Sequence, residues 1–449
     1  MPHSLIFWLR QSRCVDCIDL LREEASLSNY EEMWKKLGLD LTRHDELLES
    51  LEGTYESIIA SQRNRPKTMA YFDESVSVAH CARVKELVDR KSKGEKVIGT
   101  FCIYVPEEVI LAAGATPVAL CGGTQFSIPY AEAMLPRDIC PLIKSTLGLG
   151  LGRMCPYLPV VDMAVGETTC DGKKKTWEIL ATMVPMHVME VPHKKEQIDR
   201  ELWSKEVRLM KDKMEAVTHR EITFDTLKQG VGTVNRKREA LTQLHDLRKG
   251  PVLPISGKDA LLVTQLALLD DSERFAGKVE KLNEELEERA KKKVEVFPPE
   301  AKRILVAGCP MVVSNWKIHH LVETSGAAVV CDETCTGFRY YANSVEENAA
   351  DLDELLENVA DRYLKVNCSC FTPNQERVDD VIDLAKKYSV DGVIQYVLQY
   401  CHGYNIEAVK MEHALKKAGI PILKLETDYS EEDIGPLRTR IEAFLERLD

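Results

Sequence analysis

The sequence predicts an α/β protein with two doubly wound, parallel-sheet (Rossmann-like) domains and an N-terminal helical segment. Two observations carry this prediction. Apolar runs rich in β-branched residues alternate with amphipathic helical segments in two separate parts of the 449-residue chain. A long, charged, helical stretch separates these parts. The predicted boundaries are 1–95 for the helical region, 96–300 for the first α/β domain with its helical insertion, and 301–449 for the second.

Residues 1–95 are expected to form a helical cap or a dimer contact, and the first α/β domain begins after them. The predicted N-terminal helices are Val15–Glu24, Tyr30–Leu37, His44–Arg63 and Val84–Lys93. The predicted strands that follow are Val97–Tyr104, Pro117–Leu120, a strand and loop at Met163–Cys170, and His187–His193. A helix is expected at Pro106–Ala113, because Gly114 suits the position after a helix end.

The insertion and the second domain follow the same logic. At the end of the insertion, Phe275, Val279, Leu282 and Leu286 share one helix face, which is typical of a packing helix. Four apolar runs then predict four strands, beginning with RILVAGCP at Arg303–Pro310. The other three runs are AAVVCDETC, DGVIQYVLQYC and IPILKLETDYS, and predicted helices lie at Val378–Tyr388 and Ile406–Ala418.

Composition excludes several classes of function. The net charge of −13 argues against a general nucleic-acid binder, which needs a basic surface. The N-terminus lacks a convincing signal peptide and no apolar run is long enough to span a membrane, so we expect a cytoplasmic protein. In that compartment, 14 cysteines indicate metal ligands and buried thiols before disulfides.

Three cysteines stand at expected helix starts, and they are the most informative feature of the chain. Cys140, Cys170 and Cys401 each precede a helical pattern. Free N–H groups at a helix start favour a thiolate or an anionic cluster. Lys144 and Ser145 are expected to support an anion after Cys140. The run Lys173–Lys175 would lower the pKa of Cys170, or it forms a solvated surface or docking patch.

The other cysteines divide into strand-end candidates and structural thiols. Cys121 precedes two glycines that would let the backbone approach a bulky ligand. Cys331 and Cys335, and Cys368 and Cys370, form two pairs in which either member could be the ligand. Cys14 and Cys17 make the only C-x-x-C, which is weak evidence for zinc. The remaining thiols fit a buried or structural role, and they are Cys81, Cys102, Cys155 and Cys309.

Several familiar motifs are missing from the sequence. It contains no P-loop, no compact ferredoxin run of four cysteines, and no serine-hydrolase or zincin signature. The GLGLG run at Gly148–Gly152 follows a helical pattern and not a strand, so it does not predict a dinucleotide site.

Seven motifs together resemble the 2-hydroxyacyl-CoA dehydratase and benzoyl-CoA reductase subunit family, and in particular its double-cubane cluster proteins. They occur in order over nearly everything after about residue 65 and include IPYAEAMLPRDICPLIKS, VGETTCDGKKKTWE, CDETCTGFRYY, NCSCFTPN and DGVIQYVLQYCHGYN. The resemblance implies two doubly wound domains with an iron–sulfur cluster between them. In the dehydratases three cysteines hold one [4Fe–4S] cluster, and by motif these match Cys140, Cys170 and Cys401.

For a double-cubane [8Fe–9S] cluster, the resemblance implies further ligands at strand ends. The expected set is Cys121, Cys140, Cys170, Cys335, Cys370 and Cys401. The resemblance also implies a homodimer that receives electrons from a separate ATP-hydrolysing [4Fe–4S] activator and reduces a small, hard-to-reduce substrate. The alternatives are a 2-hydroxyacyl-CoA dehydratase subunit with one [4Fe–4S] cluster and a non-catalytic electron carrier. Residues beside the ligand motifs are candidates for catalysis, namely Gln125, Tyr130, Glu167, Arg339 and His402.

Overall fold

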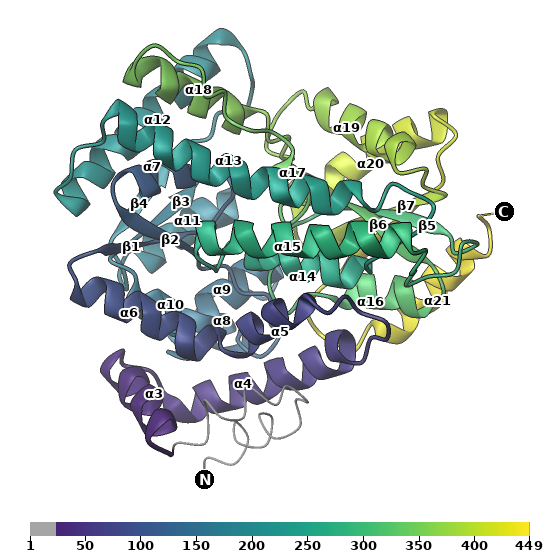
Figure 1. Cartoon of the computed structure of the whole chain (residues 1–449), viewed down its shortest axis with the longest axis horizontal. Helices are drawn as coiled ribbons and strands as arrows, with labels where there is room; N and C mark the ends of the chain where they lie inside the picture. Colours follow the sequence, from purple (N-terminus) through teal and green to yellow (C-terminus); the bar gives the residue numbers. More distant parts are fainter. Residues whose placement is uncertain (1–23, 449) are drawn as a thin grey trace.

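Two four-stranded parallel sheets form the core of the computed structural model, which describes residues 24–448 (Figure 1). Their strand orders are β2-β1-β3-β4 and β6-β5-β7-β8, so the two domains share one doubly wound topology. This confirms the predicted α/β class. The strands are β1 (Lys96–Thr100), β2 (Ala115–Ala119), β3 (Met163–Glu167), β4 (Met186–Met189), β5 (Arg303–Gly308), β6 (Ala328–Glu333), β7 (Gly392–Leu398) and β8 (Ile422–Thr427).

The strand order creates one topological switch point in each sheet. β1 pairs in parallel with β2 on one side and β3 on the other, and β5 pairs in the same way with β6 and β7. Connections therefore leave the carboxyl ends of the central strands in opposite directions and open a crevice there. Helices connect the strands within each sheet. In the first domain they are α7 (Glu107–Ala112), α8 (Ile128–Glu132), α9 (Pro141–Leu151), α10 (Tyr157–Val160) and α11 (Asp171–Leu180). In the second domain they are α16 (Lys317–Thr324), α17 (Phe338–Tyr341), α18 (Leu352–Leu364), α19 (Gln375–Lys387) and α20 (His402–Lys417), and α21 (Ile434–Leu445) follows β8.

The helical insertion joins the two domains. Its helices are α12 (Gln197–Thr218), α13 (Phe224–Asp246), α14 (Gly257–Leu266) and α15 (Ser272–Lys291). Helix α13 contacts α7 of the first domain and both α17 and α18 of the second. At this junction buried Arg238 donates to Glu108 at 2.6 Å, and the Tyr363 hydroxyl donates to the same carboxylate at 2.7 Å. On α15, all four residues of the predicted packing face are buried, as expected.

The described N-terminal helices pack along one side of the first domain (Figure 1). They are α3 (Glu24–Lys36), α4 (Leu41–Tyr55), a π-helical turn η1 (Glu56–Ala60), α5 (Met69–Ser77), a second π-helical turn η2 (Ala79–Arg83) and α6 (Val84–Ser92). The predicted helix Val15–Glu24 lies outside the described residues except for its last position. Asp40 caps α4 by accepting from the Arg43 amide, so this helix begins three residues before its predicted start.

Two predicted strands of the first domain are shorter in the structure: His187–His193 is a strand only as far as Met189, and the shortening of the other places residues in the site. The strand predicted at Val97–Tyr104 ends at Thr100, and the chain then turns, with the Val105 amide bonded to the Cys102 carbonyl at 3.2 Å. At Met163–Cys170 the strand ends at Glu167 and the predicted loop follows. After β1 the apolar pattern continues past the strand because Phe101, Ile103 and Tyr104 are buried in the turn. Among the described helices, none has the length and apolarity required to cross a bilayer.

Candidate functional site: thiols from both domains around one cavity

Cysteines follow equivalent strands in the two domains. Cys121 is the second residue after β2, and Cys335 is the second residue after β6. Cys170 is the third residue after β3, and Cys401 is the third residue after β7. Since the sheets share one topology, these residues occupy matching places at the two crevices.

Two more matched positions complete the pattern. Cys102 and Cys309 closely follow the central strands β1 and β5. Cys140 lies between β2 and β3, and the Cys368–Cys370 segment lies between β6 and β7. Each domain thus offers thiols at four corresponding places around its switch point.

The three predicted helix starts are confirmed. Cys140 is the N-cap of α9, Cys170 of α11 and Cys401 of α20. The Cys170 sulfur accepts from the Lys173 amide at 3.4 Å, so this thiol caps its helix directly. Pro141 occupies the first helical position after Cys140, where its missing N–H costs nothing.

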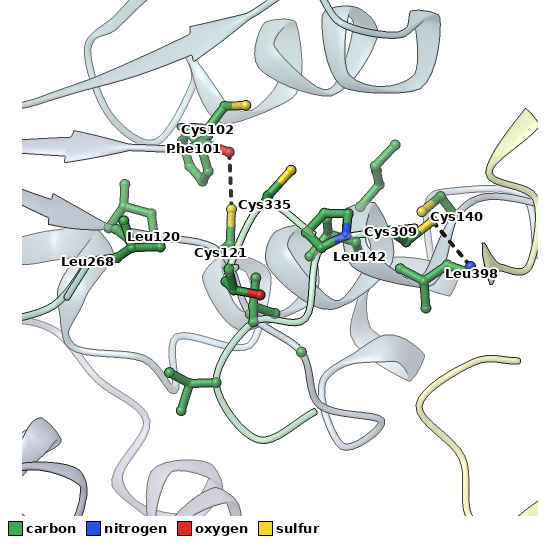
Figure 2. Close-up of a pocket in the computed structure, with 18 of the residues that line it drawn as sticks. Phe101, Cys102, Leu120, Cys121, Cys140, Leu142, Leu268, Cys309, Cys335 and Leu398 are labelled. Atoms are coloured by element: carbon green, nitrogen blue, oxygen red, sulfur yellow. Dashed lines mark hydrogen bonds between the residues drawn. The ribbon is translucent and has the colours of Figure 1, made fainter. Parts of the chain in front are cut away.

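The cysteines described above, at strand ends and helix starts of both domains, all line one cavity of about 710 Å³ between the two sheets. Of the 12 described cysteines, every one is a free thiol, and ten line the cavity. Figure 2 shows Cys102, Cys121 and Cys335 near one another, with Cys140 and Cys309 together further along the cavity. The ten are Cys102, Cys121, Cys140, Cys155, Cys170, Cys309, Cys335, Cys368, Cys370 and Cys401.

Cys401 is the favoured thiolate in one group of sulfurs. The thiols of Cys140 and Cys309 donate hydrogen bonds to the Cys401 sulfur, which lowers the pKa of Cys401 well below its usual range. The same bond raises the pKa of Cys140. Burial first, and then its bond to Cys401, raises the pKa of Cys309. These three sulfurs come from both domains, so the group exists only when the domains are joined.

The structure separates the members of one ambiguous cysteine pair but not those of the other. Cys331 lies inside β6 with no exposed surface, packed among core side chains, whereas Cys335 lines the cavity. Cys368 and Cys370 both line it. A hydrogen bond from the Cys370 thiol lowers the pKa of Cys368 to about 7, and the same bond raises the pKa of Cys370. Either sulfur therefore remains a candidate ligand at this place.

Within the Lys173–Lys175 run, Lys173 is the most buried residue and interacts with the largest number of thiols. Lys173 forms an ion pair with fully buried Glu167 and donates to the Phe101 carbonyl at 3.4 Å. Its charge lowers the pKa values of Cys102, Cys121 and Cys170 against the larger opposing effect of burial. Lys174 and Lys175 instead pair with Asp171 and Glu178 at the surface. The predicted effect on Cys170 thus comes mainly from Lys173. Lys174 borders the cavity and also interacts electrostatically with Cys170, whereas Lys175 is solvated.

The expected roles of Lys144 and Ser145 are corrected by the structure, and Gly123, which lines the cavity as expected of a ligand-facing glycine, has a packing role as well. The Lys144 ammonium bonds to Glu132 at 2.8 Å, and buried Ser145 bonds to the Thr124 amide, so neither side chain supports an anion in the cavity. At Gly123, a Cβ would approach Val312 to 2.5 Å. That glycine is therefore required for packing against the second domain.

The predicted catalytic candidates fall into different places. His402 lines the cavity in the first turn of α20, and Glu167 reaches it through Lys173. Arg339 is buried beside the thiols, where Cys335 and then Glu333 raise its pKa against the opposing effect of burial. Gln125 is exposed and Tyr130 stacks under Arg43 at 4.9 Å, so the structure does not bring these two side chains to the cavity.

Sequence reasoning assigned Cys102, Cys155 and Cys309 to structural roles, yet all three line the cavity. A usable signal existed for two of them, since Cys102 and Cys309 follow apolar strands just as Cys121 does. Cys81 is buried in η2 away from the cavity, as its apolar setting indicated. Cys14 and Cys17 lie outside the described residues.

The donor set suits an iron–sulfur cluster better than a single ion. No three His, Cys, Asp or Glu side chains within residues 24–448 converge on one metal-ion position. The thiols instead surround a space, and a polynuclear cluster needs its thiolates on separate irons. Soft sulfur ligands select such clusters over hard cations. Burial raises the pKa values of Cys121 and Cys335 to about 11, so binding at these positions would release protons.

Comparisons with known proteins agree with this description. The model of the family "2-hydroxyglutaryl-CoA dehydratase, D-component" matches residues 102–448. YjiM of Escherichia coli (strain K12), whose name assigns it provisionally as a dehydratase subunit, is 37% identical over 383 residues, covering 84% of this chain and 98% of the relative.

Two more distant relatives are named as components of specific enzymes. The (R)-phenyllactyl-CoA dehydratase beta subunit of Clostridium sporogenes is 25% identical, over 79% of this chain and 92% of its own. A benzoyl-CoA reductase subunit of Thauera aromatica is 20% identical, over 79% of this chain and 91% of its own. The relatives thus include both dehydratase and reductase components, and they match this chain over most of its length.

Proposed function

We propose that this chain, which belongs to the 2-hydroxyglutaryl-CoA dehydratase D-component family, is the iron–sulfur component of a low-potential reductase. In this role it receives electrons from a separate ATP-hydrolysing [4Fe–4S] protein and reduces a small, hard-to-reduce substrate as a homodimer. The observation that carries the proposal is the matched placement of thiols in the two domains.

The proposed ligands form three matched pairs across the two domains. Cys121 and Cys335 each stand two residues after equivalent strands, and Cys170 and Cys401 each stand three residues after equivalent strands. Cys140 corresponds to the Cys368–Cys370 segment, from which Cys370 is the proposed ligand. A site with two equivalent halves suits an [8Fe–9S] double cubane better than a single cluster. When bound, an all-thiolate cluster in this cavity would supply electrons at a very negative potential.

Protein charges around the cavity would moderate the charge of the thiolates. Lys173, held by Glu167, faces thiols of the first domain. Arg339 lies beside Cys335 and is held by Glu333 at 3.3 Å, by the Tyr404 hydroxyl and by the Gly308 carbonyl. Positive charge near a cluster stabilises its reduced form and so favours acceptance of an electron. His402 on the cavity wall is the proposed proton source.

A second candidate function is a 2-hydroxyacyl-CoA dehydratase subunit with one [4Fe–4S] cluster on Cys140, Cys170 and Cys401. The hydrogen bond between the Cys140 and Cys401 sulfurs favours it, because those two ligands are already together. A stable homodimer that fails to bind an acyl-CoA would count against this candidate. ATP-dependent turnover of a small substrate with the partner protein would exclude a non-catalytic electron carrier.

Iron and sulfide analysis of anaerobically purified protein tests the proposal. About eight irons per chain support the double cubane, whereas about four would reject it and favour the dehydratase subunit. Cys335→Ala and Cys331→Ala form a matched pair from one segment. The proposal requires the first variant to lose iron, while the second keeps it because Cys331 lies in the core. Equal iron retention by both variants would reject Cys335 as a ligand.

A further inference from the structure

The thiol-lined cavity extends into an apolar arm that none of the proposed ligands occupies. Beyond Cys121, the lining continues with Leu120 and Leu268, which Figure 2 shows together on the side of Cys121 away from Cys140 and Cys309. The same cavity is also lined by Leu47, Leu48 and Leu51 of α4, with Leu269, Tyr55, Val76 and Tyr157. The arm therefore extends from the thiols to the face of α4 that carries Leu47, Leu48 and Leu51.

Two titratable groups, His80 and Glu52, also line the arm, and burial shifts the pKa of each toward its uncharged form. His80 lines it, and burial lowers the pKa of this imidazole to about 4, so the ring is neutral near pH 7. Glu52 also lines it, and burial followed by repulsion from Glu56 and Glu49 raises the pKa of Glu52 to about 7. Near pH 7 the His80 ring is therefore uncharged and the Glu52 carboxyl is about half protonated, so these two groups add little fixed charge beside the leucines.

Helix α4 lies outside the part of the chain that the family model matches. The family match begins at residue 102, whereas α4 spans Leu41–Tyr55. Leu47 is almost fully buried and anchors the helix, while Leu48 and Leu51 are half-buried and face the cavity. Part of the wall of the arm is thus supplied by a helix that carries none of the thiols lining the cavity.

We propose that the apolar arm binds the substrate as a small, uncharged, apolar molecule, and that Leu48 and Leu51 limit its size. Binding there would place such a molecule beside Cys121, at the edge of the thiol group. The role as a substrate site rests on the proposed function, but binding of an apolar molecule does not. Apolar cavities of this kind take up xenon or benzene, which serve as probes.

Xenon-pressurised crystals of the full-length, anaerobically purified protein test the arm directly. We expect a xenon atom among Leu48, Leu51, Leu120 and Leu268. Leu51→Phe fills the arm and removes that xenon atom, whereas Ser50→Phe adds the same ring on the exposed side of α4 and leaves it in place. Absence of xenon from the arm in the wild-type protein, or its persistence in Leu51→Phe, would overturn the proposal.

Benzene titration in solution tests the size limit. Leu51→Ala enlarges the arm and should strengthen benzene binding relative to wild type, with Ser50→Ala as the control. Unchanged benzene affinity in Leu51→Ala would refute the limiting role. Iron content is measured in every sample, because iron loss bears on the proposed function alone. A protein with about four irons that still binds xenon would reject the double cubane and keep the arm.

Discussion

The ammonium of Lys173 on α11 pairs with the fully buried carboxylate of Glu167 at the end of β3, directly beside the thiols of the first domain. The pair holds a positive charge at the switch point without leaving either charge uncompensated in the interior. The ion pair therefore contributes both to the stability of the fold and to the charge around the thiols, and each contribution can be tested separately.

Replacement of Lys173 by Met should destabilise the protein by about 3–5 kcal/mol, because it leaves Glu167 buried without a counter-ion. In the cluster-loaded protein, loss of the charge should also make the reduction potential more negative. Urea unfolding and a redox titration measure the two effects. Lys175→Met is the matched control, since its exposed pair with Glu178 should contribute less than about 1 kcal/mol. Equal stability of the two variants would contradict the prediction.

The helix-start cysteines should differ in their contribution to helix stability. Cys170 accepts from the Lys173 amide, whereas the Cys401 side chain makes no capping bond. Removing the thiol by Cys170→Ala should cost about 0.5–1 kcal/mol in the iron-free protein, and Cys401→Ala should cost less. Both variants should lose iron under anaerobic loading. If iron content stayed at the wild-type value in either one, that residue would not be a ligand.

A buried ion pair on α13 should contribute much more than an exposed pair on the same helix. Arg238 is buried against Glu108 at 2.6 Å, where α13 joins both domains. Arg238→Met should cost about 3–5 kcal/mol, since it removes the ion-pair partner of a buried carboxylate and leaves it the hydrogen bond from Tyr363. Arg236, two positions earlier, pairs with Glu280 at the surface at 2.7 Å. Arg236→Met should cost less than about 1 kcal/mol in the same urea titration, and a similar cost for both would be evidence against this interpretation.

A buried histidine should make stability depend on acidity. The Arg248 guanidinium donates to Nδ1 of His245 at 2.9 Å, so the ring must be neutral at that nitrogen. Burial, followed by the Arg248 charge, lowers the pKa of His245 to about 3. Below about pH 6.5, His245 is therefore protonated in the unfolded chain but stays neutral in the folded protein. The free energy of unfolding decreases as the pH falls through this range.

The measurement compares the free energy of unfolding of wild type and His245→Asn from about pH 6.5 to about pH 5. The wild-type value should fall more steeply, by about 1.4 kcal/mol per pH unit for one proton. His44 and His80, whose pKa values burial also lowers, are present in both proteins and cancel in the difference. Identical slopes would show that His245 does not provide this linkage.

The fold was predictable because its signals are local. Alternating strands and helices follow from hydrophobic periodicity, and the N-cap positions of Cys140, Cys170 and Cys401 follow from each thiol preceding a helical pattern. Strand ends were less predictable. Residues after β1 remain apolar because Phe101, Ile103 and Tyr104 are buried, so the pattern overstates the length of that strand.

The composition of the site depended on contacts between distant segments. Cys309 resembled a core thiol in sequence, but the structure places it against Cys401 from another strand end. Gln125 and Tyr130 adjoin a ligand motif, yet their side chains point elsewhere, because Gln125 is exposed and Tyr130 on α8 lies against Arg43. Nearness in sequence to a ligand therefore did not predict nearness in space.

The sequence by itself determined two α/β domains, the helix-start thiols and the family. Local periodicity, capping and motif order carry that information, and each can be read from a short stretch of sequence without knowing which distant segment it contacts. Only the tertiary structure decided that the two domains present matching thiols to one cavity, that Cys335 and not Cys331 faces it, and that α4 closes its apolar arm. Those facts depend on the packing of two sheets through a shared helical layer, which sums many weak contacts between residues far apart in the chain.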